Sequence, residues 1–147
     1  MKVSIGFDHG ALNLRSPVIE ILNELQHQVT DHGTDSPDSV DYPDYARLVA
    51  EDVSSGRADM GILCCTTGIG MSIAANKVKG VRAAMVHCED EAELTRRHNH
   101  ANVLCLGGLH TTAYEAKRLI EVFLKSEPEG GRHARRVGKF SALEDES

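Results

Sequence analysis

Short β-rich runs alternate with longer helical patterns along this chain, and the alternation constrains its fold more than any other feature. Five runs have the composition and length of buried strands: residues 3–7, 28–30, 60–64, 82–86 and 103–106. Strands that alternate with helices form a parallel sheet, covered by helices on both faces and joined by right-handed crossovers. The sequence therefore predicts an α/β chain with a three-layer α/β/α Rossmann-like fold around a five-stranded parallel sheet.

The helical spacing of apolar residues is clearest in residues 14–25. Ser16 and Pro17 have the types of an N-cap and a first-turn residue, so we expect the regular part of this helix to begin there. Segment 32–44 is rich in Gly, Ser, Asp and Pro and is predicted to be a loop, and residues 126–131 are the linker candidate. The other predicted helices span residues 45–55, 71–77, 89–97, 111–125 and 132–143.

Length and composition exclude several classes of protein. The 147 residues suit one compact domain, residues 1–147, which can bury a core without disulfides or metals. A formal net charge of -6 argues against a general nucleic-acid binder. No apolar run approaches the roughly 20 residues of a membrane span, and Asp8 interrupts the N-terminus before a signal-length run develops. The four cysteines have no disulfide-framework spacing, so we expect a cytoplasmic protein that binds neither nucleic acid nor membrane.

The residues that directly follow predicted strands are the candidates for a ligand site. In an open parallel sheet, ligands bind outside the carboxyl ends of the strands. Asp8 and His9 follow the first predicted strand, residues 65–70 follow the third, and residues 107–109 follow the fifth. Polar and glycine residues therefore gather where this architecture places a ligand.

The segment from Cys65 to Gly70 is the most informative of these. A strand there runs through glycines directly into a helix, which leaves backbone N–H groups free to hold a phosphate, a carboxylate or an enediolate. A cysteine at this place lies near the positive end of the helix dipole and could act as a base or a nucleophile. The alternative is a buried structural cysteine beside a tight turn, and spacing alone does not separate the two.

Two further polar groups allow more than one interpretation. His98 and His100 could be acid/base, metal-binding or surface histidines, and metal binding is least favoured because no nearby carboxylate or cysteine completes a ligand set. Arg132 and Arg136 are four residues apart, so on a helix they project from one face and could hold a phosphate together. The alternative for these arginines is a solvated helix start.

Six segments together resemble the family of ribose-5-phosphate isomerase B and the lactose-pathway galactose-6-phosphate isomerase. The resemblance covers nearly the whole chain, and the number of segments in the right order makes it specific. They are Gly-Phe-Asp-His-Gly at 6–10, Asp-Tyr-Pro-Asp-Tyr-Ala at 41–46, Gly-Ile-Leu-Cys-Cys-Thr-Thr-Gly-Ile-Gly at 61–70, Ile-Ala-Ala-Asn-Lys at 73–77, Arg-His-Asn at 97–99 and Gly-Gly-Arg-His at 130–133.

The resemblance implies an aldose–ketose isomerase that needs no metal or other cofactor. Its substrate would be a sugar phosphate, with ribose 5-phosphate converted to ribulose 5-phosphate through a cis-enediolate. In this interpretation His98 helps to open the furanose ring, and Cys65 takes the proton from the carbon next to the carbonyl. Thr67 hydrogen-bonds the thiol or the substrate, and backbone N–H groups of residues 66–70 hold the enediolate charge.

The resemblance also implies the residues that bind the substrate. Members of the family build the site between two subunits, with the C-terminal arginines supplied by the partner. The chain is therefore expected to form a homodimer or a dimer of dimers, with its C-terminal helix reaching the partner subunit. The implied substrate-binding residues are Asp8, His9, Tyr42, Thr66, Gly68, Ile69, Gly70, Asn99, Arg132 and Arg136.

Three residues depart from the family pattern and keep other functions open. Thr66 stands where many relatives have glycine, and His100 replaces a common acidic residue. Leu109 occupies a position where many relatives carry a phosphate-binding arginine, although His110 follows it. The alternatives are an isomerase of another phosphorylated or free sugar, such as galactose 6-phosphate or allose, and a non-catalytic subunit that binds sugar phosphates.

Overall fold

A computed structural model describes all residues from Met1 to Ser147, and it confirms the predicted five-stranded parallel sheet. The sheet has the strand order β2-β1-β3-β5-β4, and every neighbouring pair is parallel. In the register of the central strands, Ile62 of β3 lies between Ile5 of β1 and Leu104 of β5. The strands are β1 (Lys2–Phe7), β2 (Gln28–Asp31), β3 (Met60–Cys65), β4 (Ala83–Met85) and β5 (Val103–Gly107).

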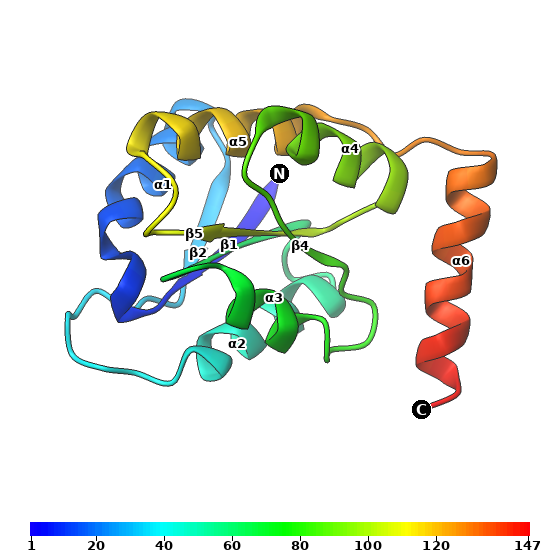
Figure 1. The fold of residues 1–147 in the computed structure, drawn as a ribbon, viewed down its shortest axis with the longest axis horizontal. Helices are drawn as coiled ribbons and strands as arrows, with labels where there is room; N and C mark the ends of the chain where they lie inside the picture. Colours follow the sequence, from blue (N-terminus) through cyan, green and yellow to red (C-terminus); the bar gives the residue numbers. More distant parts are fainter.

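Helices cover both faces of the sheet and give the predicted three layers (Figure 1). One face carries α1 (Leu12–Glu24), α4 (Glu89–Asn99) and α5 (Ala113–Lys125). The other face carries α2 (Tyr42–Ser54) and α3 (Ile69–Ala75). Neighbouring side chains of a strand point to opposite faces, so Cys64 packs in the first apolar cluster and Cys65 in the second.

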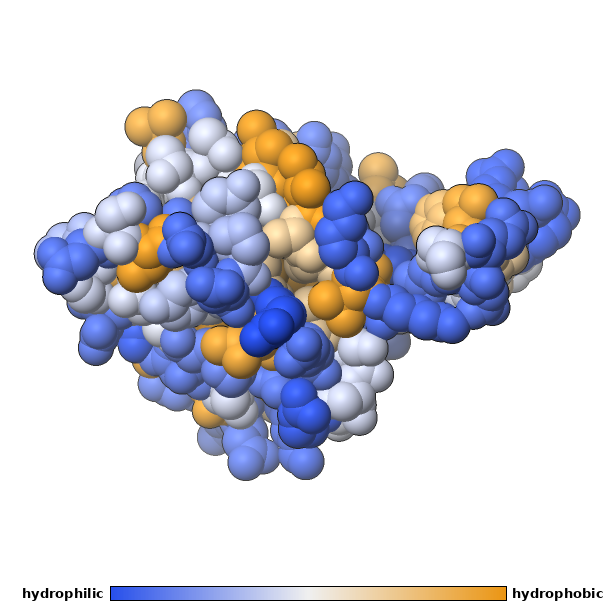
Figure 2. Space-filling view, turned by 90° about the horizontal axis from the view of Figure 1, so that it is seen from below, coloured by the Kyte–Doolittle hydropathy of each residue, from blue (hydrophilic) through white to orange (hydrophobic).

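The last helix, α6 (Arg132–Asp145), stands apart from these layers and touches the rest of the chain mainly at α4 (Figure 1). Only His133 and Val137 of this helix are buried. Phe140 and Leu143 are among the exposed large apolar residues, and apolar side chains also gather on the α2 and α3 face beside α6 (Figure 2). The helix therefore leaves much of its apolar surface without a partner in the single chain.

Three helices, α1, α2 and α3, begin earlier than the sequence predicts. Instead of starting at Pro17, α1 starts at Leu12 and contains the proline inside it, because the 3₁₀ turn η1 (His9–Ala11) already leads the chain into the helix. Asp8 caps that turn by accepting the N–H of Gly10 at 2.8 Å. Similarly, α2 starts at Tyr42 with Pro43 in its first turn, where a missing N–H costs no helical hydrogen bond.

All four cysteines are free thiols. None of the helices combines the length and the apolar character that crossing a membrane requires.

Candidate active site

The pocket at the carboxyl ends of β1 and β3 brings together most of the predicted residues of the 65–70 segment. These two strands are neighbours in the sheet. The chain leaves β1 toward one face of the sheet and leaves β3 toward the other face. A crevice therefore opens between the two connections. The pocket has a volume of about 360 Å³. It is lined by Asp8, Tyr42, Cys65, Thr66, Thr67, Ile69, Gly70 and Ile73.

Cys65 is the thiol that belongs to this pocket. It is the last residue of β3, it is 4% exposed, and its Sγ accepts the backbone N–H of Gly68 at 3.2 Å. Gly68 precedes α3 with φ +81°, and a Cβ there would lie 3.1 Å from the carbonyl carbon of Leu106, so only glycine suits the turn. Cys64 points into the opposite core and is fully buried, which raises the pKa of its thiol.

Backbone N–H groups around Cys65 are available to an anion. The amides of Thr66, Thr67 and Gly70 form no hydrogen bond to an acceptor of the chain. The Thr67 hydroxyl accepts the N–H of Ile69 at 3.3 Å, so its proton is free to be donated to a ligand or to sulfur. A loop with unpaired amides beside a thiol suits a developing negative charge.

Two glycines leave the space that the side chains of Thr66 and Tyr42 fill. A Cβ on Gly10 would overlap the Thr66 hydroxyl and lie 3.1 Å from the Thr66 Cβ, so the turn after β1 and the loop after β3 meet only because residue 10 is glycine. A Cβ on Gly70 would lie 2.6 Å from two ring carbons of Tyr42. The tyrosine ring at the start of α2 therefore lies directly against α3.

Asp8 and His9 take different places. Asp8 is buried at the pocket wall, and because one carboxylate oxygen accepts the Gly10 N–H, the other can face a ligand. His9 is exposed and does not line the pocket. Its Nδ1 accepts the N–H of Val40 at 3.2 Å, which ties the loop before α2 to the turn after β1.

Four of the predicted residues lie at the opposite end of the sheet. α4 returns from the carboxyl ends of the strands, so His98 and Asn99 at its C-terminus lie near the beginning of β5, with Arg132 and Arg136 on α6 beyond them. The five residues of β5 cover about 16 Å. A single chain therefore does not bring these four residues to Cys65.

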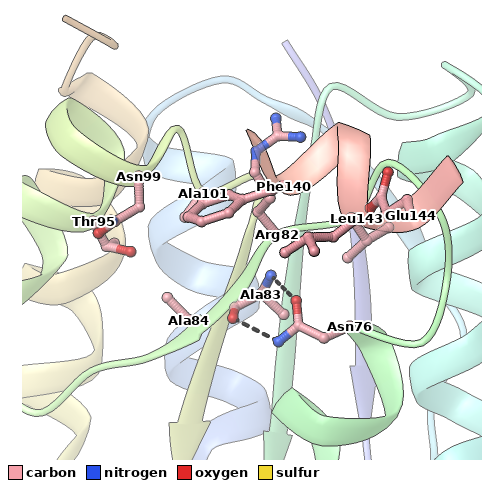
Figure 3. Close-up of a pocket in the computed structure, with 11 residues that line it drawn as sticks. Asn76, Arg82, Ala83, Ala84, Thr95, Asn99, Ala101, Phe140, Leu143 and Glu144 are labelled. Atoms are coloured by element: carbon pink, nitrogen blue, oxygen red, sulfur yellow. Dashed lines mark hydrogen bonds between the residues drawn. The ribbon is translucent and has the colours of Figure 1, made fainter. Parts of the chain in front are cut away.

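Asn99 lines a second hollow, of about 370 Å³, between α6, α4 and β4 (Figure 3). Asn76 forms its floor by exchanging two hydrogen bonds with the main chain of Ala83, of 2.8 and 2.9 Å. Phe140 and Leu143 of α6 form an apolar wall.

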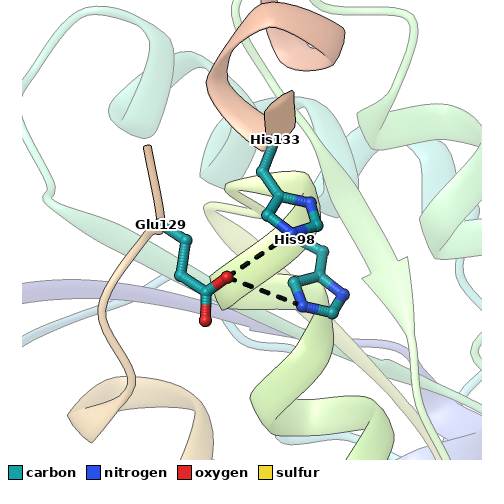
Figure 4. Close-up of side chains that lie close together, drawn as sticks. All are labelled: His98, Glu129 and His133. Carbon is teal, nitrogen blue, oxygen red and sulfur yellow. Dashed lines mark ion pairs between the residues drawn. The ribbon is translucent and has the colours of Figure 1, made fainter. Parts of the chain in front are cut away.

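His98 lies in a compact group with Glu129 and His133 (Figure 4). The two imidazole rings are stacked, with centroids 4.0 Å apart and planes 4° from parallel. A metal ion bound by imidazole lies in the plane of the ring, and two nearly parallel planes do not converge on one ion. This arrangement is that of two imidazoles sharing one carboxylate.

Glu129 is the residue of this group that the sequence analysis did not select. It lies in the predicted linker, where an acidic residue carries no local signal of its own. Its spacing of four residues from His133 and its place beside the Gly-Gly-Arg-His segment were the signals that could have found it.

The fold and the Cys65 pocket together define a parallel α/β protein with a pocket that suits a small, negatively charged ligand at the carboxyl ends of its central strands. The chain belongs to the ribose/galactose isomerase family, whose sequence profile matches residues 3–140.

Named relatives agree with this assignment. The chain is 41% identical over 143 residues to ribose-5-phosphate isomerase B of Escherichia coli strain K12, which covers 97% of this chain and 96% of that protein. It resembles the structure of ribose-5-phosphate isomerase B from Clostridium thermocellum with a TM-score of 0.97 and 46% identity, over 99% of each chain. For the Mycoplasma genitalium enzyme with bound ribulose-5-phosphate, the TM-score is 0.95 at 44% identity, over 99% of this chain and 97% of that one. The prediction of an aldose–ketose isomerase is confirmed at the level of the family.

Proposed function

We propose that this chain converts ribose 5-phosphate to ribulose 5-phosphate, without a metal or other cofactor, by proton transfer through Cys65. The observation that carries the proposal is the Cys65 sulfur beside the unpaired amides of Thr66, Thr67 and Gly70 in one pocket. Relatives named ribose-5-phosphate isomerase B, one of them solved with ribulose-5-phosphate, support this choice of substrate.

The proposed reaction moves one proton between neighbouring carbons of the open-chain sugar. His98 opens the furanose ring, and the Cys65 thiolate removes the proton from C2 of the aldehyde form. The charge that develops on the oxygens of the cis-enediolate is held by the free amides of the 66–70 loop, and Thr67 donates its hydroxyl proton to the same group. The proton of the C2 hydroxyl passes to O1 within the enediolate, and the Cys65 thiol returns its proton to C1, which gives the ketose.

A second copy of the chain completes the site in this proposal. Cys65 lies at one end of the sheet and His98, Arg132 and Arg136 at the other, so one chain holds only half of the required groups. The exposed apolar residues of α6, together with Ile73, which is 58% exposed at the rim of the pocket, offer a surface for such a partner. The assembly is a homodimer or a dimer of dimers.

The proposed location is the cytoplasm, where a sugar phosphate is available and four free thiols stay reduced.

Leu109 favours a second candidate substrate, because it replaces the arginine that binds phosphate in many relatives. This substrate would be a sugar without a phosphate group, or a sugar whose phosphate group is at another position. Leu109 is 68% exposed, and it does not line the Cys65 pocket. The deciding experiment is a panel of ribose 5-phosphate, galactose 6-phosphate, allose and free ribose, assayed with a chelator present. Turnover of ribose 5-phosphate well above the others supports the proposal.

Two results of this panel would contradict the proposal. Thermal stabilisation by sugar phosphates without any conversion would identify a non-catalytic binding subunit. Loss of turnover in the chelator, with recovery on addition of a divalent cation, would contradict the metal-independent mechanism.

A further inference from the structure

Glu129 connects the segment between α5 and α6 to the C-terminus of α4. Its carboxylate accepts the Arg97 Nε–H at 2.7 Å and also forms an ion pair with the Arg97 Nη2. Its main-chain N–H donates to the carbonyl of Arg97 at 2.9 Å, and its own carbonyl accepts the Nε2–H of His100 at 2.7 Å. Both the main chain and the side chain of Glu129 are therefore fixed in place.

One oxygen of this fixed carboxylate faces two imidazoles. Oε2 lies 3.8 Å from Nε2 of His98 and 3.4 Å from Nε2 of His133 (Figure 4). Both rings present the same nitrogen to the same oxygen, and they are stacked and nearly parallel. Neither contact is a hydrogen bond, so the carboxylate acts on the rings through its negative charge. That charge favours the tautomer with the proton on the nearer nitrogen, Nε2, which leaves Nδ1 as the free base.

The surroundings of the group keep its carboxylate ionised and one of its two imidazoles neutral. The hydrogen bond from Arg97 lowers the pKa of Glu129, so the carboxylate stays ionised through the neutral range. His133 is buried, and burial together with the neighbouring His98 and Arg132 lowers its pKa. His133 therefore stays neutral, and the ionised carboxylate of Glu129 faces the more exposed His98 as well.

We propose that Glu129 is the positioning residue of the ring-opening step, holding His98 with its proton on Nε2 so that Nδ1 exchanges a proton with the sugar. The inference rests on the proposed function, because it assigns Glu129 a part in the reaction given above. Glu129 itself does not touch the substrate. His100, which departs from the family pattern, then has a structural part, since it holds the main chain of Glu129.

The test separates ring opening from proton transfer between carbons. Ribose 5-phosphate must be opened before it reacts, whereas ribulose 5-phosphate is an open chain because its 5-hydroxyl carries the phosphate. In deuterated water, the Cys65 step alone exchanges a C1 hydrogen of ribulose 5-phosphate for deuterium. Turnover of ribose 5-phosphate needs both steps.

We expect Glu129→Gln to lower kcat for ribose 5-phosphate at least tenfold, a typical contribution of one positioned acid/base group. Deuterium exchange into ribulose 5-phosphate should stay within about twofold of the parent rate, since that step does not use His98. Glu93→Gln is the matched control, because Glu93 also binds Arg97, at 2.8 Å, but is not part of the His98 group. It should leave both rates unchanged.

Equal losses of both rates in Glu129→Gln, or no loss of either, would overturn the positioning role. So would an equal loss of turnover in Glu93→Gln, because the effect would then pass through Arg97. Failure of the proposed function would look different: the parent would show no exchange, or Cys65→Ala would retain it. Nitrogen-15 NMR of the histidines supplies a second measurement, in which the Nε2–H form of His98 should be populated in the parent and reduced in Glu129→Gln.

Discussion

The backbone N–H of Gly68 donates a hydrogen bond to the sulfur of Cys65, with 3.2 Å between the two atoms. The left-handed conformation of Gly68 and the turn into α3 produce this contact. A donor aimed at sulfur stabilises the thiolate, which is the form that removes a proton from carbon. Cys64 lies next to it in sequence but is fully buried on the other face of the sheet.

Replacement of Cys65 by alanine should abolish isomerisation, with a fall in kcat of about 10² to 10⁴-fold or more, as for loss of a general base. Substrate binding, measured by calorimetry, should be nearly unchanged, because the thiolate acts mainly in the transition state. Cys64→Ala should keep its turnover and lose only about 1 kcal/mol of stability. A dead Cys64 variant beside an active Cys65 variant would contradict this assignment of the base.

Gly10→Ala should lower the free energy of unfolding far more in the parent than in a Thr66→Gly background. The added Cβ overlaps the Thr66 hydroxyl, and overpacking of this kind costs about 1 to 3 kcal/mol. Removal of the threonine side chain relieves the overlap, so a double-mutant cycle in urea should give a coupling of about 1 kcal/mol or more. Additive effects of the two changes would mean that the loops do not press on each other.

Mixing of two inactive proteins should restore activity if the site is shared between subunits. Cys65→Ala supplies intact arginines, and the double variant Arg132→Ala/Arg136→Ala supplies an intact cysteine. Random exchange between equal amounts makes about half of the dimers hybrids, and one of the two sites in each hybrid is complete. The mixture should therefore have about a quarter of the parental activity. No recovery after demonstrated subunit exchange would place the arginines outside the partner's site.

Leu109→Arg should raise the preference for phosphorylated sugars. The Leu109 main chain is anchored to the Thr66 carbonyl at 2.9 Å, and the exposed side chain leaves room for arginine. A hydrogen bond to a charged group contributes about 1.5 to 3 kcal/mol, so the ratio of kcat/KM for ribose 5-phosphate over free ribose should rise roughly ten- to a hundredfold. Leu109→Gln is the uncharged control. An unchanged ratio in a folded Leu109→Arg protein would show that residue 109 does not face the phosphate.

Stability should depend on the buried carboxylate of Asp52, which is 7% exposed. Burial alone would raise its pKa, but hydrogen bonds from His32, Arg57 and Ser4 hold the pKa below the ordinary value. Because the folded pKa is depressed, this contribution is present above the unfolded pKa of about 3.9 and is lost as the pH falls through the folded value.

Asp52→Asn should therefore lower the free energy of unfolding by about 1 to 3 kcal/mol at neutral pH, and by less below about pH 4. Urea unfolding at several pH values measures the difference. Glu51→Gln on the same helix is the control, because its pair with Arg47 is exposed and contributes about 0.5 kcal/mol at most. A cost for Asp52→Asn that stays constant down to acid pH would contradict the ionised network.

The sequence by itself determined the order of strands and helices, and it placed several residues of the candidate site at one edge of the sheet. Side chains repeat every two residues in a strand and every 3.6 in a helix, so the local apolar pattern reveals both kinds of element. Asp8 and Cys65 could be placed at one edge of the sheet, since they follow parallel strands. The start of α1 was misplaced because Ser16 and Pro17 have the local types of a helix start, whereas the Asp8 cap and the preceding turn had already begun the helix.

Only the tertiary structure decided how distant segments meet. The strand order, the contact of Tyr42 with Gly70, and the separation of His98 and the arginines from Cys65 all depend on packing between elements far apart in sequence. Glu129 shows the difference most clearly, because its partners Arg97 and His98 precede it by about thirty residues. A local pattern reports which face of its own element is apolar. The pattern does not predict which other element that face packs against, because the partner depends on the long-range packing of the whole chain.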